Sequence, residues 1–413
     1  MISSARNINK ELWPDIAQAP HAIFRAWVAK QLLLRISQRV AVNITLPNGT
    51  HVQPFQSTRP TMVIKSDNFF HRLGSDYKIG LGESYMAGEW DVAEGSDLAD
   101  VLTPFAERLL DIVPAWMRSF RTFFEPKHPL DEENNRRGAK KNIERHYDLS
   151  NELFTRFLDE TMTYSAAWFA DDVRTFTNLS AAQRRKVAGI LDFARVSKDS
   201  SVLEIGSGWG QLALQAAERG AKIHTITLSE EQLKLAKERF DKAGVQAQVN
   251  IEIRDYRDVT DRYDAVVSVE MIEAVGEKYW DEYFETVSRS LRQGGYFGLQ
   301  AITMPHDRML ASRHAYTWVH KYIFPGGLIP SVDAIESNCA KHGLNVVDRR
   351  SLGLDYASTL RLWRERFHEN FESIKQQGFD DVFGRMWEFY LAYSEAGFAS
   401  GHLDVWQLGI VKK

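Results

Sequence analysis

The sequence has little cysteine and no long apolar run. Cys339 is the single cysteine among 413 residues, so no disulfide can form within the chain. No Cys/His cluster has the spacing of a structural zinc site, and we expect no metal. No stretch approaches 18 uncharged apolar residues, and the first residues lack the apolar core of a secretion signal. These absences predict a cytoplasmic protein whose contact with a membrane is peripheral.

An excess of positive charge is also missing. Lys and Arg number 51 against 55 for Asp and Glu, a formal net charge of −4, which argues against a generally basic nucleic-acid-binding protein. Hydrophobic residues make up 44% and charged residues 26%, the balance of an ordinary globular chain. At roughly 150 residues per domain, this length predicts two to three domains.

The first part of the chain is typical of a small α+β domain, which we place at residues 1–125. Residues 21–39 predict a helix with four cations and no acid, suited either to anionic lipid or to ordinary docking. A strand over residues 40–46 and the turn Pro47-Asn48-Gly49 predict a hairpin with residues 51–55. This domain would present lipid or form a dimer. Prolines and polar residues predict a linker over 126–140.

The second domain, residues 141–413, alternates short apolar strands with helices. The expected strands cover 201–205, 222–227, 248–254, 264–269 and 296–302. That alternation predicts an α/β fold with a doubly wound, mostly parallel sheet. Residues 355–399 are rich in aromatic side chains and predict a helical extension.

The strongest local signal is a strand that runs into a glycine-rich turn and a helix over 211–219. Gly206, Gly208 and Gly210 allow a tight turn and close approach of a ligand, while the helix start offers free N–H groups. The spacing G-x-G-x-G and the absence of an acid after the second strand disfavour NAD, and there is no P-loop. The turn alone predicts only a nucleotide-like ligand.

Seven segments carry a wider pattern: residues 80–90, 146–151, 161–165, 201–210, 226–229, 269–276 and 321–327. Taken together, they resemble class I S-adenosylmethionine (SAM) methyltransferases, and more narrowly the cyclopropane fatty acid synthase family. Residues 269–276, 300–305 and 386–397 look closest to the branch that makes 10-methylene acyl chains, precursors of 10-methyl lipids. The resemblance implies a Rossmann-like methyltransferase domain with a smaller N-terminal α+β domain and a helical C-terminal extension.

The resemblance also implies how SAM would be held. Three side chains would close the pocket over the sulfonium: Tyr147, Tyr164 and Ser165. The methionine end would lie against Glu204 and the turn residues Gly206, Gly208, Trp209 and Gly210. The ribose edge would be formed by Thr227, Leu228, Ser229 and Gln232. Tyr256, between Asp255 and Arg257, would pack on the adenine.

The reaction that the resemblance implies is electrophilic. The double bond of an unsaturated acyl chain in a phospholipid attacks the SAM methyl group and leaves a carbocation. A hydride shift and proton loss would give a 10-methylene chain, which a reductase would convert to the 10-methyl form. Such a site must exclude water and place a base beside the cation. The aromatic helices of 355–399 would either line an acyl tunnel or pack as core.

The base in this family is bicarbonate, and here the match is incomplete. Glu273, Tyr356 and the backbone N–H of Ile302 occupy matching positions, but Ala166 replaces a cysteine and Gln300 a histidine. Glu270 stands where many family members carry glycine. The site could retain bicarbonate, take its base from Glu273, Glu270 or Tyr356, or have lost activity.

Three alternatives stay open at this stage. The same cation, closing a ring, would make the chain a cyclopropane-fatty-acyl-phospholipid synthase. The losses at Ala166 and Gln300 would also suit a non-catalytic SAM- or lipid-binding homologue. An ordinary small-molecule methyltransferase would leave the N-terminal domain without a role. The expected partners are an unsaturated phospholipid at the membrane surface and a second copy in a homodimer, with no nucleic acid.

Overall fold

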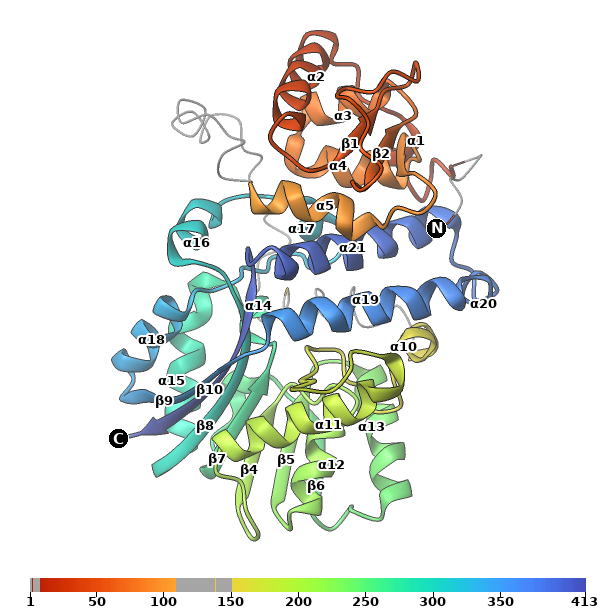
Figure 1. Ribbon diagram of the computed structural model, residues 1–413. Coiled ribbons are helices and arrows are strands. Elements are labelled where there is room, and N and C mark those ends of the chain that lie inside the picture. The colour runs from red at the N-terminus through yellow and green to blue at the C-terminus, as the bar shows by residue number, and fades with distance from the viewer. Residues whose placement is uncertain (1, 3–7, 109–137, 139–150) are drawn as a thin grey trace. The chain divides into compact units, whose positions relative to one another are not determined.

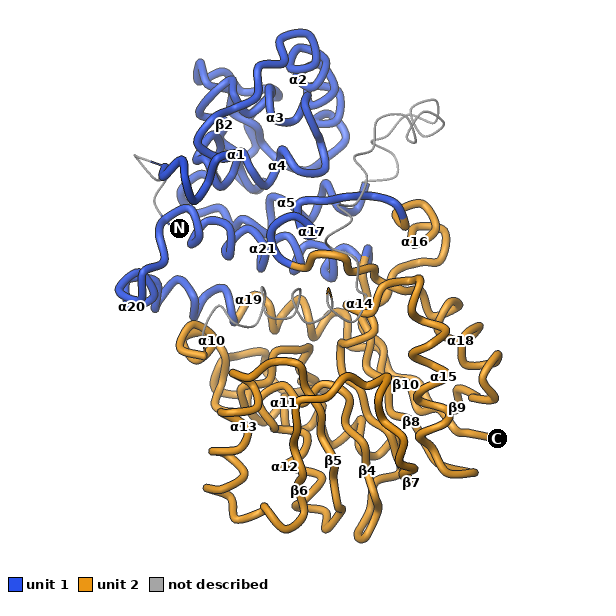
Figure 2. The backbone as a smooth tube through the Cα atoms, turned by 180° about the vertical axis from the view of Figure 1, so that it is seen from behind, with its two compact units in different colours: residues 1–127, 314–323, 363–402 blue, residues 128–313, 324–362, 403–413 orange. Residues whose placement is uncertain are grey.

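The computed structural model describes residues 2, 8–108, 138 and 151–413 (Figure 1). The chain divides into two compact units, each built from separate stretches of sequence (Figure 2). The first unit takes residues 1–127, 314–323 and 363–402, and the second takes 128–313, 324–362 and 403–413. Of the linker expected at 126–140, only Gly138 lies within the described residues, and Tyr147 lies outside them.

The first unit combines helices with a small mixed sheet. Its strands are β1 (Asn43–Thr45), β2 (Thr61–Ile64) and β3 (Trp90–Val92), in the order β1-β2-β3. Its helices are α1 (Pro14–Ala17), α2 (Ile23–Ser37), α3 (Asn68–Ser75), α4 (Tyr77–Met86), α5 (Leu98–Glu107), α17 (Trp318–Tyr322), α20 (Phe371–Lys375) and α21 (Asp381–Ala399). The helix expected over 21–39 is thus confirmed as α2.

The hairpin expected between residues 40–46 and 51–55 is wrong. β1 pairs in parallel with β2, and the expected second strand contributes only an isolated bridge between Thr45 and His51. The N–H of Val52 still donates to the carbonyl of Ile44 at 2.9 Å. Two residues later Pro54 has no N–H to offer, so the antiparallel ladder cannot continue.

The aromatic helices expected over 355–399 are confirmed, but most of them belong to the first unit. α19 (Gly353–Glu369) begins in the second unit and ends in the first, and α21 lies wholly in the first. Phe389 of α21 lies 5.6 Å from Tyr85 and 6.4 Å from Trp90 between ring centroids. These rings are fully or almost fully buried, so this stretch of α21 forms core with the N-terminal residues.

The second unit is organised around a seven-stranded sheet of order β6-β5-β4-β7-β8-β10-β9. The strands are β4 (Ser201–Ile205), β5 (Lys222–Thr227), β6 (Val249–Ile253), β7 (Tyr263–Val269), β8 (Leu291–Thr303), β9 (Leu344–Ser351) and β10 (Asp404–Lys412). The five expected strands are confirmed and pair in parallel, whereas β10 runs antiparallel to β8 and β9.

Helices cover both faces of this sheet (Figure 1). α11 (Phe176–Phe193), α12 (Gln211–Glu218) and α13 (Glu230–Ala243) share one apolar cluster with it, and α15 (Trp280–Ser290) and α18 (Val332–Lys341) share another. Shorter helices lie in the connections: α10 (Asn151–Phe157), η2 (Tyr256–Asp258), α14 (Ile272–Val275), η3 (Glu277–Tyr279) and α16 (His306–Ser312). Ligands of such sheets bind at the carboxyl ends of the parallel strands.

Across the described part of the chain, no helix combines the length and apolar character needed to span a bilayer.

Candidate active site

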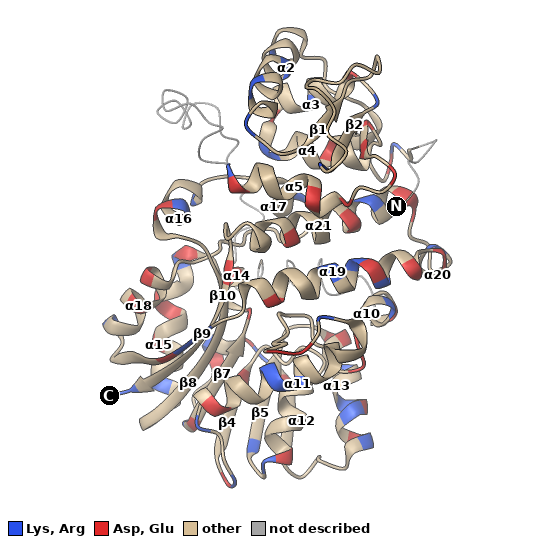
Figure 3. Cartoon of the chain, in the orientation of Figure 1, with Lys and Arg blue, Asp and Glu red and all other residues tan. Residues whose placement is uncertain are grey.

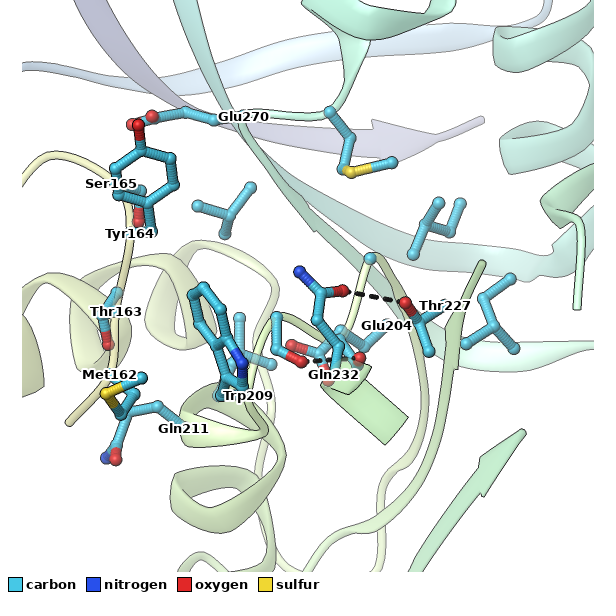
Figure 4. A pocket seen from close by; sticks show the side chains of 18 of the residues that line it. Met162, Thr163, Tyr164, Ser165, Glu204, Trp209, Gln211, Thr227, Gln232 and Glu270 are labelled. Atoms are coloured by element: carbon cyan, nitrogen blue, oxygen red, sulfur yellow. Dashed lines mark hydrogen bonds between the residues drawn. The ribbon is translucent and has the colours of Figure 1, made fainter. Parts of the chain in front are cut away.

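A cavity of about 130 Å³ lies at the carboxyl ends of β4, β5 and β7 (Figure 4). It is lined by ten of the residues expected to bind SAM: Tyr164, Ser165, Glu204, Gly206, Gly208, Trp209, Thr227, Leu228, Gln232 and Tyr256. Glu270 also lines it, on the side of Tyr164 and Ser165 in Figure 4. Residues from five separate segments of the sequence therefore meet at one site.

The turn after β4 needs glycine at Gly206 and Gly210 because each has a left-handed backbone and a close neighbour where a Cβ would lie. Gly206 has φ of 92°, and a Cβ there would lie 2.7 Å from the Cγ and Sδ atoms of Met271. Gly210 caps α12 with φ of 87°, and a Cβ there would meet the Phe240 ring at 2.7 Å. Gly210 therefore shapes the turn and is not among the residues that line the cavity.

The expected ribose edge is held together by its own hydrogen bonds. The Thr227 hydroxyl donates to Oε1 of Gln232 at 2.9 Å, so the Gln232 amide NH₂ is the group that this side chain offers to a ligand. Ser229 does not line the cavity. Its hydroxyl accepts from the Gln232 N–H at 3.2 Å and caps α13, so Ser229 positions Gln232.

Tyr256 lines the cavity, whereas its sequence neighbours Asp255 and Arg257 do not. The Tyr256 ring stands edge-on to the Tyr283 ring, with centroids 5.4 Å apart. Arg257 Nη2 donates to Oδ2 of Asp255 at 2.6 Å, and the Arg257 guanidinium lies 5.4 Å from the Tyr256 ring centroid. Asp255 and Arg257 therefore hold the aromatic side chain in place and do not line the cavity themselves.

Two positioning residues were not anticipated. The Trp209 indole N–H donates to Oδ1 of Asn151 at 2.7 Å, and Arg239 Nη1 donates to the Trp209 carbonyl at 2.6 Å. Asn151 is the last residue of segment 146–151, which carried the family resemblance, so the sequence did contain a signal for its role. Arg239 lies on α13 among other charged residues and gives no local signal.

Glu204, at the end of β4, is a buried carboxyl group with an unused acceptor. Its side chain is 3% exposed, and its Oε2 atom has no hydrogen-bond partner among the described residues. Burial raises the pKa of Glu204 to about 8 because desolvation disfavours the charged form. Such a group is suited to a cationic ligand.

The expected anion-binding residues gather around the carboxylate of Glu270. Its Oε1 atom accepts the backbone N–H of Ala166 at 3.0 Å and Nε2 of Gln300 at 2.8 Å. Its Oε2 atom accepts the Tyr356 hydroxyl at 2.9 Å. The backbone of Glu270 has φ of 51°, a left-handed conformation.

A second layer of buried polar groups fixes this cluster. Gln407 on β10 donates from Nε2 to Oε1 of Gln300 at 2.9 Å, and Arg350 Nη1 donates to Oε1 of Gln407 at 3.1 Å. The Lys186 ammonium donates to the Ser165 hydroxyl. Burial lowers the pKa of Lys186 to about 8, while the charge of Glu270 acts to raise it. Neither Lys186 nor Gln407 gave a signal in the sequence, because each sits within an ordinary helix or strand.

Glu273 carries a second buried carboxyl group, whose hydrogen bond differs from those of Glu270. Its Oε1 atom accepts the backbone N–H of Ile302, and its Oε2 atom is buried with no partner among the residues that the structure describes. Burial, and then the nearby charge of Glu270, raises the pKa of Glu273 to about 8. The five expected catalytic residues therefore fall into two groups. Ala166, Gln300 and Tyr356 donate hydrogen bonds to Glu270, whereas Ile302 donates to Glu273, the fifth.

The sheet order, the glycine turn after β4 and the cavity beside it define a class I SAM-dependent methyltransferase. The chain belongs to the mycolic acid cyclopropane synthetase family, whose sequence profile matches residues 134–408.

Two curated relatives align over nearly the whole chain. Tuberculostearic acid methyltransferase UfaA1 of Mycobacterium tuberculosis is 48% identical over 98% of this chain and 96% of its own length. Cyclopropane-fatty-acyl-phospholipid synthase of Escherichia coli is 33% identical over 92% of both chains. Among solved structures, mycolic acid cyclopropane synthase CmaA1 complexed with SAH and CTAB has a TM-score of 0.61 and 27% identity. It covers 66% of this chain and 98% of its own.

Proposed function

We propose that this enzyme uses SAM to methylate the double bond of an unsaturated acyl chain in a phospholipid and yields a 10-methylene acyl chain. The observation that carries the proposal is that the glycine turn after β4 and the carboxylate of Glu270 line the same cavity. Identity favours the same product, at 48% to the tuberculostearic acid methyltransferase against 33% to the cyclopropane synthase.

The cavity fits SAM on its own chemistry. SAM supplies an electrophilic methyl group on a sulfonium and, with its ammonium and carboxylate, carries a net positive charge. Glu204 offers a buried, unpartnered carboxyl oxygen, and the Gly206 backbone lines the cavity without a side chain. Gln232 would donate to the ribose, and Tyr256 would contact the adenine.

The remaining residues of the cavity suit carbocation chemistry. Apolar side chains that include Met162, Val187 and Met271 line it and would exclude water, which would otherwise trap the cation. The carboxylate of Glu270 lines the cavity and places negative charge and a proton acceptor there, and Glu273, three residues further along the chain, supplies a second carboxyl group.

The decisive experiment incubates the protein with oleoyl phospholipid vesicles and CD₃-labelled SAM. We expect a methylene chain that retains two of the three deuterons and gives a ketone on ozone cleavage. A cyclopropane also retains two, but resists ozone and shows ring proton signals in NMR spectra. A cyclopropane product would replace the proposed one. Bound SAM without any lipid product would favour the non-catalytic alternative.

Glu204 predicts a specific pH dependence of SAM binding. With a folded-state pKa of about 8, Glu204 is protonated at pH 6, and a cationic ligand must displace that proton. We expect the Kd for SAM to fall by up to about tenfold per pH unit as pH rises from 6 to 8 and then level off. Calorimetric titration at pH 6, 7, 8 and 9 measures it.

The control for this prediction is Glu204→Gln, which keeps the side-chain shape and cannot ionise. The variant should bind SAM more weakly at pH 8 and lose the dependence between pH 6 and 8. An unchanged Kd for the wild type across this range would remove Glu204 from the SAM site.

For the lipid partner, we propose that α2 contacts the membrane surface. Its first turns expose Ile23, Phe24 and Trp27 to 67%, 75% and 60%, and basic side chains lie along it (Figure 3). Phe24→Ser combined with Trp27→Ser should reduce pelleting with oleoyl phospholipid vesicles. Insensitivity both to anionic lipid and to charge reversal at Arg25, Lys30 and Arg35 would exclude an electrostatic contribution. A homodimer and a partner reductase that completes the 10-methyl chain belong to the same proposal.

A further inference from the structure

We propose that Glu270 is a built-in catalytic base that stands in place of bicarbonate and accepts the proton lost in the final step. The inference rests on the proposed function, because it assigns a residue to that reaction. A side-chain carboxylate and a bicarbonate ion present the same planar pair of oxygen atoms. An enzyme with its own carboxylate at that position needs no dissolved anion.

The hydrogen bonds carry this inference. The residues matched to bicarbonate binding include the backbone N–H of Ala166, the Gln300 amide and the Tyr356 hydroxyl, and all three donate to the carboxylate of Glu270 at 2.8–3.0 Å. Gln300 is held for this role, since its own Oε1 atom accepts from Gln407. With these donors engaged, the site does not fit a separate bicarbonate ion.

The backbone gives an independent argument. Glu270 has φ of 51°, a left-handed conformation that glycine adopts freely and that strains a residue with a Cβ. Strain of this kind persists where the surroundings over-determine it and gathers at functional sites. The backbone strain at Glu270 is therefore consistent with a functional role for the carboxylate at this point of the cavity wall.

The charges nearby favour an ionised but basic carboxylate. Burial raises the pKa of Glu270, while the positive charge of Lys186 and the three donors oppose that rise. Glu270 therefore remains able to ionise and is a stronger base than an exposed glutamate. It lines the cavity, so it can contact the reacting carbon atoms.

The proton step balances without any further reactant. After methyl transfer and the hydride shift, a C–H bond of the new methyl group breaks. Its electron pair forms the exocyclic C=C bond and quenches the cation, and the proton goes to a carboxylate oxygen of Glu270. The resulting carboxylic acid returns the proton to solvent before the next turnover. Tyr356 and Gln300 are positioning residues in this scheme.

The test compares the wild type, Glu270→Gln and Glu270→Gly in buffers freed of carbon dioxide, using oleoyl phospholipid vesicles. We expect wild-type turnover to be unchanged when bicarbonate is removed or added. Glu270→Gln should lower kcat by roughly 10²- to 10⁴-fold, with a Kd for SAM close to that of the wild type. Glu270→Gly should be equally inactive, and added formate or bicarbonate should restore part of its turnover.

A readout other than activity uses ¹³C-labelled formate. NMR spectra should show binding to Glu270→Gly and none at this site in the wild type. Thermal unfolding with Asp199→Gly as the matched control reports the folded state, because Asp199 is an exposed residue outside the cavity with φ of 66°. Glu270→Gly keeps the test open if Glu270→Gln fails to fold, since glycine fits this backbone.

Different failures point to different conclusions. Wild-type turnover that requires bicarbonate, or Glu270→Gln with normal turnover, overturns the role of Glu270 and leaves the proposed function intact. A folded Glu270→Gly variant that stays inactive at every formate and bicarbonate concentration and binds no labelled formate also overturns it. A wild type that binds SAM but makes no methylated lipid defeats the proposed function itself.

Discussion

Gly206→Ala should weaken SAM binding by roughly 10- to 100-fold while the chain stays folded. The φ of Gly206 is 92°, outside the region that alanine adopts easily, and the added Cβ would lie 2.7 Å from Met271. The left-handed backbone strains an alanine by about 1–3 kcal/mol. Room for the added Cβ requires either the turn or the Met271 side chain to move, and both line the cavity proposed for SAM. Calorimetric titration with SAM measures the loss, and circular dichroism checks the fold.

Gly244→Ala is the matched control for this substitution. Gly244 also has a left-handed backbone, with φ of 69°, but a Cβ there meets nothing within 4 Å and the residue does not line the cavity. This variant should lose some stability and bind SAM like the wild type. Equal SAM affinity in Gly206→Ala and Gly244→Ala would show that the turn after β4 does not hold SAM.

Glu273→Gln should lower turnover by about 10²- to 10³-fold and leave the Kd for SAM nearly unchanged. The amide keeps an acceptor for the Ile302 N–H but cannot ionise, whereas Glu273 ionises increasingly as pH approaches 8 and then supplies negative charge that stabilises a carbocation. Glu273 does not line the SAM cavity, so ground-state binding of SAM should be spared. Steady-state kinetics with oleoyl phospholipid vesicles and SAM titration separate the two effects.

Stability against pH gives this prediction a second readout. The folded-state pKa of Glu273 is about 8, above its ordinary value of 4.5, so the folded chain binds more protons between these values. The contribution of Glu273 to the free energy of unfolding is therefore present below pH 4.5 and is lost as pH rises toward 8. Urea denaturation at pH 5 and 8 should show a smaller loss in Glu273→Gln.

Glu277→Gln is the control carboxylate, since Glu277 lies four residues further on and pairs with Arg313 at 2.7 Å. It should change neither turnover nor the pH dependence of unfolding appreciably. A Glu273→Gln variant that loses SAM affinity and turnover together would make Glu273 a structural residue.

Much of the lining of the cavity proposed for SAM could be predicted because its signals are local. Gly206 and Gly208 follow a short apolar strand and precede a helix, and Thr227 ends the next strand, so the parallel topology brings them to one edge. Ser229 and Asp255 were expected to bind SAM, but neither lines the cavity. Each caps a helical turn and supports a neighbour that lines the cavity, and a motif does not separate these roles.

By itself, the sequence determined the parallel sheet, the position of the glycine turn and many of the residues that line the cavity proposed for SAM, because strand periodicity and turn chemistry act over a few residues. The failure of the expected hairpin has a local cause at Pro54, which the sequence already contains. Only the tertiary structure decided how α21 is used. It also decided that Ala166, Gln300 and Tyr356 share one carboxylate. Ala166 and Tyr356 lie 190 positions apart in the sequence. Contacts over such separations depend on how the sheet and helices pack, and no local pattern in the chain specifies them.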